Sequence, residues 1–121
     1  MSFENVDLFP FGTEVNEHGN LSVGGNDIIS LAKQYGTPLY VYDEPTIRTM
    51  ARQFVSEFTS RYPNTKVAYA SKAFLNISMA RIAEEENLEL DVVSGGEIAV
   101  AAAAGFPTAK MHFHGNNKTP A

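Results

Sequence analysis

Short apolar strands alternate with helical segments after residue 66, and this alternation is the strongest constraint on the fold. Strand-like runs cover 66–70, 88–94 and 111–114, with helical segments at 76–86 and 94–104 between them. A strand therefore recurs about every 22 residues, which is typical of βαβ units that build a parallel sheet. The sequence predicts an α/β fold in which three βα units are visible.

An amphipathic helix precedes these units. Asp43 is a residue type that caps helices, and Pro45 falls in the first turn, where its missing N–H costs little. Apolar residues then recur at helical spacing from Ile47 to Phe58, so they form one face of the helix. The run at 39–42, just before this helix, has the composition of a strand.

The residues before this run are rich in Gly, Asn and acidic side chains. They predict short strands near 8–11 and at 20–23, followed by a helix that starts at Asn26 or Asp27 and runs to Tyr35. Gly36 stands where the end of that helix needs a left-handed residue, and a proline two residues later prevents continuation.

Three βα units are too few to close a parallel sheet. Strands in parallel sheets are buried on both faces, and the apolar run at 88–93 fits such burial. A barrel of eight units typically needs about 250 residues, whereas this chain has 121. We therefore expect the chain to be the N-terminal part of a longer protein.

The composition excludes several classes of protein. The net charge is −5, from 9 basic and 14 acidic residues, and no basic stripe suited to nucleic acid is present. The longest apolar run, 98–104, is too short to span a membrane, and the first residues lack the pattern of a signal peptide. The chain has no cysteine. We expect a cytoplasmic protein that binds neither nucleic acid nor membrane.

Lys72 is the candidate catalytic residue. It follows Tyr69, Ala70 and Ser71 at the carboxyl end of a predicted parallel strand, where barrel folds gather their active-site loops. A lysine amine held among apolar neighbours can lose its proton and form a Schiff base with a carbonyl compound. On position alone, a solvated strand end is the simpler explanation.

Three motifs in order favour the catalytic interpretation. Residues 69–74 with the helix after them resemble the cofactor-attachment site of the alanine-racemase-like, pyridoxal-phosphate-dependent decarboxylases. Residues 91–97, Asp-Val-Val-Ser-Gly-Gly-Glu, resemble the next strand and loop of that group. Residues 114–118, His-Gly-Asn-Asn-Lys, resemble a loop of the diaminopimelate decarboxylase family in particular, and 35–43 match its approach to the first barrel helix.

This resemblance implies a fold and a division of the chain. The fold would be a partial (β/α)8 barrel of the alanine-racemase type, comprising its first three βα units. Residues 1–42 would form an N-terminal segment that packs on a β-domain absent from this chain, and residues 43–121 the first part of the barrel that binds pyridoxal 5'-phosphate. The resemblance also implies a small-molecule amino-acid substrate and a homodimer at full length.

The resemblance further implies which residues serve the cofactor. Lys72 would carry it covalently, while Ala70, Asp91, Glu97 and His114 would lie near it. Asp91 could equally be a strand carboxylate with a purely structural partner. Glu97 also fits a capping box, in which the side chain of Ser94 caps the helix and Glu97 bonds back to the Ser94 N–H. We expect no metal site, since histidine ligands at suitable spacing and cysteines are missing.

The activity that the resemblance implies is decarboxylation of meso-2,6-diaminopimelate to L-lysine and CO2, a reaction of lysine biosynthesis. An ornithine, arginine or carboxynorspermidine decarboxylase of the same fold would share Lys72 and Asp91. A non-catalytic binding or regulatory relative is the third alternative, and retention of Lys72 weighs against it. We expect this chain alone to be inactive, because the residues that bind the phosphate and the ring nitrogen lie later in the family.

Overall fold

The computed structural model describes residues 4–116 and 118, and its contacts divide the chain into two units. One unit is Met1–Thr49 and the other is Met50–Ala121. The division falls inside a long helix, a few residues beyond the predicted boundary between 42 and 43. The assignment of the two segments to a β-domain and a barrel stays a prediction.

The first unit is a small antiparallel sheet with one helix. Its strands pair in the order β1-β2-β3, with Glu14 opposite Ser22 and Ser22 opposite Asp27. The helix α1 follows β3 directly and ends at Gly36, whose φ of +83° is the left-handed conformation that the sequence predicts there. The elements are the 3₁₀ turn η1 (Val6–Leu8), β1 (Glu14–Val15), β2 (Leu21–Val23), β3 (Asn26–Asp27) and α1 (Ile28–Tyr35).

The start of α1 depends on one carboxylate. Asp27 caps the helix, because its Oδ1 accepts a hydrogen bond from the Ser30 N–H at 2.8 Å. Its Oδ2 accepts from the side-chain amides of Asn16 at 2.6 Å and Asn20 at 2.8 Å. These hydrogen bonds, the one from Asn20 first, hold the pKa of Asp27 well below its usual range. The sequence prediction of a helix that starts at this point is confirmed.

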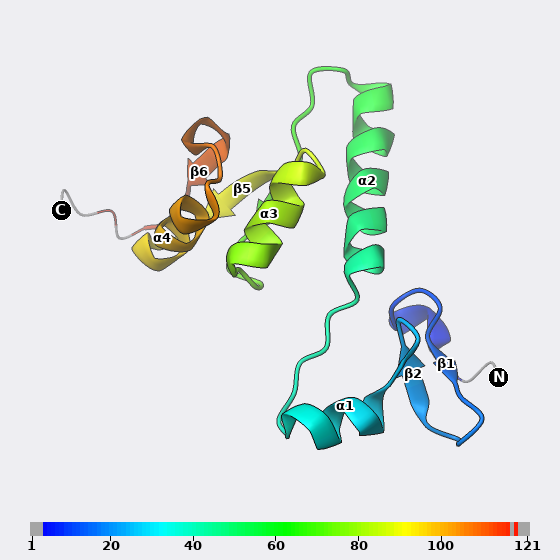
Figure 1. Ribbon diagram of the computed structural model, residues 1–121. Coiled ribbons are helices and arrows are strands. Elements are labelled where there is room, and N and C mark those ends of the chain that lie inside the picture. The colour runs from blue at the N-terminus through cyan, green and yellow to red at the C-terminus, as the bar shows by residue number, and fades with distance from the viewer. Residues whose placement is uncertain (1–3, 117, 119–121) are drawn as a thin grey trace. The chain divides into compact units, whose positions relative to one another are not determined.

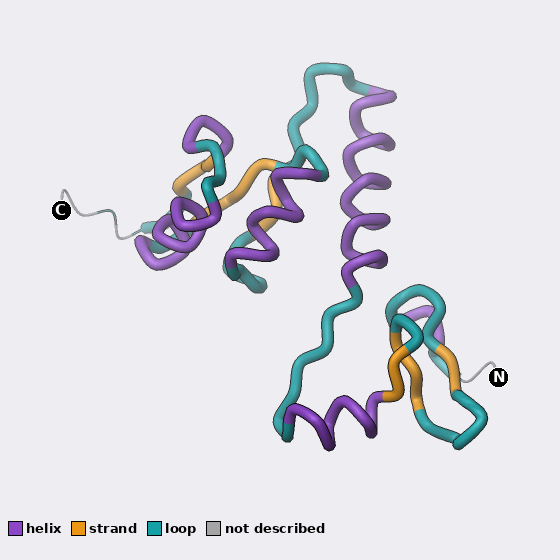
Figure 2. Tube along the Cα trace, viewed as in Figure 1, coloured by secondary structure: helices purple, strands orange, loops and turns teal. Residues whose placement is uncertain are grey.

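Two predicted strands of the first unit are wrong. Near 8–11 the chain forms a 3₁₀ turn that ends at Leu8, and the Phe11 N–H donates to the Thr46 Oγ1 at 2.9 Å. Pro10 has no N–H for a ladder, which explains why this apolar run is not a strand. Residues 39–42 form an exposed loop (Figure 2). Their composition favours a strand, but a strand needs a ladder partner, and none of the strands in the described part of the chain pairs with them.

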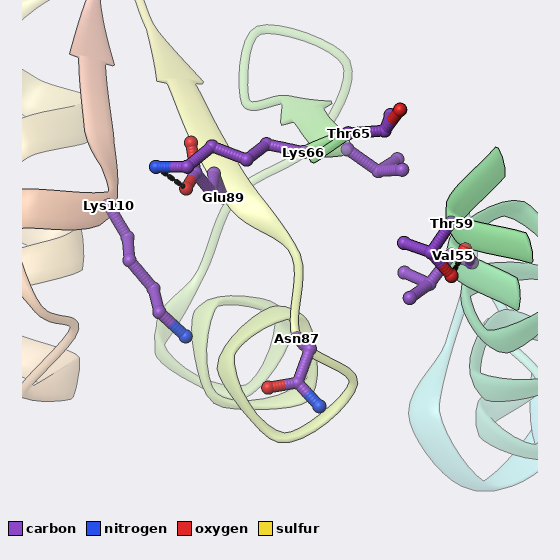
Figure 3. A pocket seen from close by; sticks show the side chains of 8 residues that line it. Val55, Thr59, Thr65, Lys66, Asn87, Glu89 and Lys110 are labelled. Atoms are coloured by element: carbon purple, nitrogen blue, oxygen red, sulfur yellow. Dashed lines mark hydrogen bonds and ion pairs between the residues drawn. The ribbon is translucent and has the colours of Figure 1, made fainter. Parts of the chain in front are cut away.

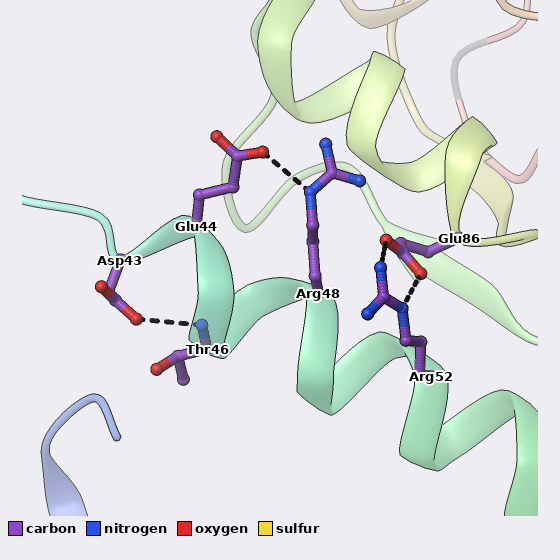
Figure 4. A network of polar contacts seen from close by, with 6 residues as sticks. All are labelled: Asp43, Glu44, Thr46, Arg48, Arg52 and Glu86. Carbon is purple, nitrogen blue, oxygen red and sulfur yellow. Dashed lines mark hydrogen bonds and ion pairs between the residues drawn. The ribbon is translucent and has the colours of Figure 1, made fainter. Parts of the chain in front are cut away.

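The helix α2 (Glu44–Arg61) starts as the sequence predicts. Figure 4 shows Asp43 at its beginning, where Oδ2 accepts a hydrogen bond from the Thr46 N–H at 2.9 Å. The apolar face of the helix is only partly buried. Ala51 is buried in the core of the second unit, whereas Phe54 and Phe58 are exposed and stack on each other, with ring centroids 6.4 Å apart.

The second unit contains the predicted parallel sheet (Figure 1), which confirms the α/β fold class. Its strand order is β4-β5-β6, so β5 is central, and Ala70 lies opposite Asp91 while Asp91 lies opposite His112. Asn76 and Ser94 cap the two helices that connect the strands. The elements are β4 (Ala68–Ala70), α3 (Ile77–Glu85), β5 (Glu89–Val92), α4 (Gly95–Ala104), the 3₁₀ turn η2 (Thr108–Lys110) and β6 (Met111–Phe113).

Only one face of this sheet is packed within the described residues. Leu90 and Val92 of β5 are fully buried, and they share one core cluster with Ala83 of α3 and Ala101 of α4. Because side chains alternate along a strand, Glu89 and Asp91 lie on the other face. The expectation that both faces of the strands are buried is wrong for β4 and β6, whose residues are half-buried or exposed. The partly open, polar face carries the candidate site.

A two-point ion pair joins α2 to the end of α3. Arg52 Nε and Nη2 donate to the two carboxylate oxygens of Glu86 at 2.6 and 2.7 Å (Figure 4). The Glu86 side chain is 6% exposed and that of Arg52 is 66% exposed. Removing such a partner from a nearly buried carboxylate lowers the free energy of unfolding, because the unpaired charge stays out of water.

We expect Arg52→Met to lower the free energy of unfolding by about 1–2 kcal/mol, since it leaves the buried Glu86 charge with fewer donors. The matched control is Arg61→Met, which removes an exposed pair with Glu57 on the same helix and is expected to cost less than about 0.5 kcal/mol. Urea titrations followed by circular dichroism measure both values. Equal losses in the two variants would contradict this account.

Asp27 makes the first unit sensitive to acid. A carboxyl whose folded pKa is lowered contributes its stability above its ordinary pKa, and loses that contribution as pH falls through the folded value. We therefore expect the Ser30 amide resonance to follow a titration with a midpoint below 3.8. The variant Asp27→Asn should lack this titration and keep α1 unchanged between pH 5 and pH 2. An NMR pH series checks both expectations, and a midpoint at or above 4 in the unmodified chain would refute them.

Candidate active site

Lys72 lies in a tight turn at the carboxyl end of β4. The Ser71 N–H donates to the Asp91 carbonyl at 3.0 Å, which extends the pairing with β5 by one residue beyond the strand. The Ala73 N–H donates to the Ala70 carbonyl at 3.1 Å and closes the turn. The Tyr69 hydroxyl donates to the Phe74 carbonyl at 2.8 Å, so the turn is supported from the side of the core. These hydrogen bonds hold the backbone in place on both sides of Lys72.

The amine of Lys72 is exposed and available. Within residues 4–116 and 118, its Nζ has neither a hydrogen bond nor an ion pair. Lys72 is exposed, so these residues do not surround its amine with the apolar neighbours that would favour loss of its proton. Beside it, Ser71 is 2% exposed and its Oγ has no hydrogen-bond partner, which is uncommon for a buried polar atom. An unpaired amine at this strand end suits a group that reacts with a carbonyl.

Asp91 and His114 approach each other next to this turn. Asp91 lies on β5 opposite Ala70, and the His114 N–H donates to the Val92 carbonyl at 3.0 Å just after β6. The His114 Nδ1 is 4.0 Å from the Asp91 Oδ1, so the two form an ion pair when the imidazole is protonated. The structure thus brings together these two predicted residues, from two neighbouring strands, at one edge of the sheet.

Gly115 permits this approach. A Cβ built on Gly115 would lie 2.5 Å from the Val93 carbonyl oxygen and 3.3 Å from the Val93 carbonyl carbon, which no side chain tolerates. The loop after β6 therefore lies directly against the loop after β5 only because residue 115 is glycine. The motif that contains it was noted in the sequence, but the steric reason needed the structure. Asn116 is exposed, residue 117 lies outside the described residues, and Lys118 Nζ lies 5.3 Å from the Phe113 ring centroid.

Glu97 is used by the backbone of the same loop. The Ser94 Oγ accepts a hydrogen bond from the Glu97 N–H at 3.3 Å, which is the predicted cap of α4. The Glu97 Oε2 accepts from the Val93 N–H at 2.6 Å, not from the Ser94 N–H as the capping box predicts. The return bond reaches one residue further back because β5 ends at Val92 and leaves the next N–H free of the ladder. Glu97 fixes the loop beside Asp91.

The remaining predicted position, Ala70, leaves room on the open face. It is half-buried, and its small side chain lies beside Asp91 in the parallel register. A lysine amine, a carboxylate, an imidazole and a small residue therefore surround the carboxyl ends of three adjacent strands. This donor set fits an aldehyde cofactor, because the amine can bind its carbonyl and the acid–base pair can hold protons nearby.

A second charged cluster lies at the other end of the sheet and was not predicted. Glu89, at the start of β5, pairs with Lys66 at 2.8 Å and with His112 of β6. A pocket of about 190 Å³ adjoins it, lined by Val55, Thr59, Thr65, Lys66, Val67, Asn87, Glu89 and Lys110 (Figure 3). None of the predicted site residues lines this pocket. Its charges come together only through the strand register, which the sequence alone does not reveal.

The described residues also bear on metal binding and membrane insertion. Among the described residues, no group of three or more histidine, aspartate or glutamate side chains is arranged to hold a metal ion. No helix in the same part of the chain has the length and apolar character needed to cross a membrane.

Comparisons with known proteins identify the family of this chain. Residues 46–121 match the family described as pyridoxal-dependent decarboxylase, pyridoxal binding domain. The chain is 58% identical over 109 residues to the diaminopimelate decarboxylase of Bacillus methanolicus, covering 90% of this chain and 25% of the relative. It is 55% identical over 113 residues to the diaminopimelate decarboxylase of Bacillus subtilis, covering 93% of this chain and 26% of the relative. The chain thus spans about a quarter of the length of these curated relatives.

Solved structures give the same result. The crystal structure of diaminopimelate decarboxylase from M. jannaschii, in complex with L-lysine, matches with a TM-score of 0.74 and 32% identity over 88% of this chain and 25% of that protein. A crystal structure from Aquifex aeolicus matches with a TM-score of 0.72 and 32% identity. With a family match over more than half of its residues, this chain belongs to the pyridoxal-dependent decarboxylases.

Proposed function

We propose that this chain is the N-terminal quarter of an enzyme that converts meso-2,6-diaminopimelate into L-lysine and CO2. The observation that carries this proposal is the exposed Lys72, unpaired among the described residues, in the turn after β4, whose Ser71 N–H is bonded to Asp91 of the neighbouring strand. The relatives named diaminopimelate decarboxylase, at 55–58% identity, support the choice of substrate. The reaction belongs to lysine biosynthesis.

Lys72 would hold the cofactor through its Nζ. When bound, pyridoxal phosphate supplies an electron sink for the pair released as CO2 leaves the substrate. The ammonium of Lys72 must first lose its proton, because only the neutral amine attacks a carbonyl carbon. In its neutral form the Lys72 amine would also be able to carry a proton to or from a reacting carbon of the substrate.

Asp91 and His114 would manage protons and charge next to Lys72. The Asp91 carboxylate would stabilise positive charge on neighbouring nitrogen atoms, and the His114 imidazole is a side chain that can donate or accept a hydrogen bond there. Ala70 leaves space for the cofactor beside Asp91. Glu97 acts on this site through the loop, since its carboxylate holds the Val93 N–H.

The wider organisation completes the proposal. Residues 1–42 are proposed to pack on a β-domain and residues 43–121 to be the first part of the cofactor-binding barrel. The full-length enzyme is proposed to be a cytoplasmic homodimer that takes a small amino acid as substrate. The resemblance described above supports these points. In the full-length protein, an absorbance assay tests whether the cofactor is bound, and light scattering measures the oligomeric state.

Lys72 provides the direct test. In the full-length protein, Lys72→Ala is expected to lower kcat for diaminopimelate by at least about a thousandfold, because the covalent and the proton-transfer roles are lost together. Lys72→Arg should not restore activity, since a guanidinium stays protonated. Borohydride reduction followed by peptide mass spectrometry should place the pyridoxyl label on Lys72.

The control for this test is Lys110→Ala, which removes the same charge before β6, at the opposite end of the sheet. It should keep kcat within about twofold of the unmodified enzyme. A label on another lysine, or turnover of ornithine or arginine without turnover of diaminopimelate, would overturn the proposal.

Asp91 and His114 should act as one unit. Asp91→Asn and His114→Asn are each expected to lower kcat by about 10- to 100-fold, in line with the loss of a positioned acid or base. The double variant should lose less than the product of the two single losses, because each residue acts through the other. Steady-state kinetics of the four proteins measures this coupling. Strictly multiplicative losses would show that the two side chains act independently.

A further inference from the structure

Glu89 is a nearly buried carboxylate with two side-chain partners, a lysine and a histidine, on different segments. Its side chain is 8% exposed, and its Oε1 accepts a hydrogen bond from the Lys66 Nζ at 2.8 Å (Figure 3). Its Oε2 pairs with the His112 Nε2. The hydrogen bond from Lys66, followed by that from His112, lowers the pKa of Glu89, while burial opposes this shift. The carboxylate is thus held ionised between its two partners.

These partners come from the two chain segments on either side of β5. Lys66 precedes β4 by two residues and lies six residues before Lys72. His112 lies on β6, two residues before His114. Glu89 itself lies two residues before Asp91 on the same face of β5. Each residue of the cluster therefore precedes a candidate site residue on the same segment: Lys66 precedes Lys72, Glu89 precedes Asp91, and His112 precedes His114.

The apolar pattern alone does not determine how these strands align. A slip of one residue would turn Leu90 and Val92 out of the core, so burial excludes it. A slip of two residues keeps both side chains on the core face, and burial discriminates against it much less. In the observed register Ala68 lies opposite Glu89 and Met111 lies opposite Leu90, so Lys66 stands two positions before the residue opposite Glu89 and His112 two positions after it. Each ion pair therefore opposes a two-residue slip in the direction that carries its partner further from Glu89.

We propose that Glu89 is a positioning residue for the active site, which sets the register of β4 and β6 on β5 and so places Lys72 and His114 beside Asp91. This inference rests on the proposed function for its effect on catalysis, whereas the effect on register is independent of it. Glu89 touches neither cofactor nor substrate in this proposal. It acts on the site only through the alignment of the strands.

The register effect can be measured without any assay of activity. The Ser71 N–H donates to the Asp91 carbonyl and the His114 N–H donates to the Val92 carbonyl, so these two amides report on pairing at the far end of the sheet. In the full-length protein, Glu89→Gln should lower the hydrogen-exchange protection of both by at least about tenfold relative to Phe106. The Phe106 N–H donates to the Ala101 carbonyl within the core and serves as an internal reference for global stability.

The catalytic effect separates positioning from simple destabilisation. Misplacement of a catalytic group by 1 Å can cost about 100-fold in rate, so Glu89→Gln should lower kcat by about 10- to 100-fold and leave KM within about twofold. It should also slow the rate at which added pyridoxal phosphate becomes trapped on Lys72 by borohydride. Lys66→Met should act in the same direction, and the double variant should lose no more than Glu89→Gln alone.

The matched control is Glu57→Gln, which removes an exposed carboxylate paired with Arg61 on α2 and should leave all three readouts unchanged. If Glu89→Gln does not fold, Lys66→Met decides the question, because the Lys66 side chain is 69% exposed and tolerates replacement. Folded variants with normal protection at Ser71 and His114 and with normal kcat would overturn the proposal. An unmodified protein without diaminopimelate turnover would sink the proposed function instead, while the exchange data would still decide the role of Glu89.

Discussion

The burial of one face of β5 organises the second unit. Leu90 and Val92 are the largest side chains that are fully removed from solvent, and the cluster around them includes residues of α2, α3 and α4. Because side chains alternate, this burial forces Glu89 and Asp91 onto the opposite face. The polar face is thus a consequence of hydrophobic packing, and the central strand presents two carboxylates on it, Glu89 and Asp91.

The candidate site is assembled from short segments that follow strands. Lys72, Asp91 and His114 are separated along the chain by a helix each, yet the parallel register brings their segments to one edge. Backbone contacts do most of this work: Ser71 and His114 are hydrogen-bonded to β5, and Gly115 allows the loops to touch. These contacts use backbone atoms and not the side chains of Lys72, Asp91 and His114, which suits a family whose cofactor brings its own chemistry.

Local features of the fold were predictable from the sequence and nonlocal ones were not. The caps at Asp43 and Ser94 and the parallel βα units depend on neighbouring residues, and the structure confirms them. The strand predicted at 39–42 needed a ladder partner that no local pattern can supply. The same limit hid the Glu89 cluster, because Lys66 and His112 meet it only through the register. The sequence predicts that the Glu97 side chain accepts a hydrogen bond from a backbone N–H at the start of the helix. The donor is the N–H of Val93 and not that of Ser94, because β5 ends at Val92, the residue before Val93.

The order of the strands in the parallel sheet matches their order along the chain, β4-β5-β6. Each strand therefore docks on the edge left by the one synthesised just before it, after a single helix has emerged between them. Each pairing spans a single helix, and because loop-closure entropy grows with loop length, it costs less entropy than pairing with a more distant segment would. A nascent polypeptide leaving the ribosome can build this sheet in one direction, with Lys72, Asp91 and His114 reaching their common edge in the sequence of translation.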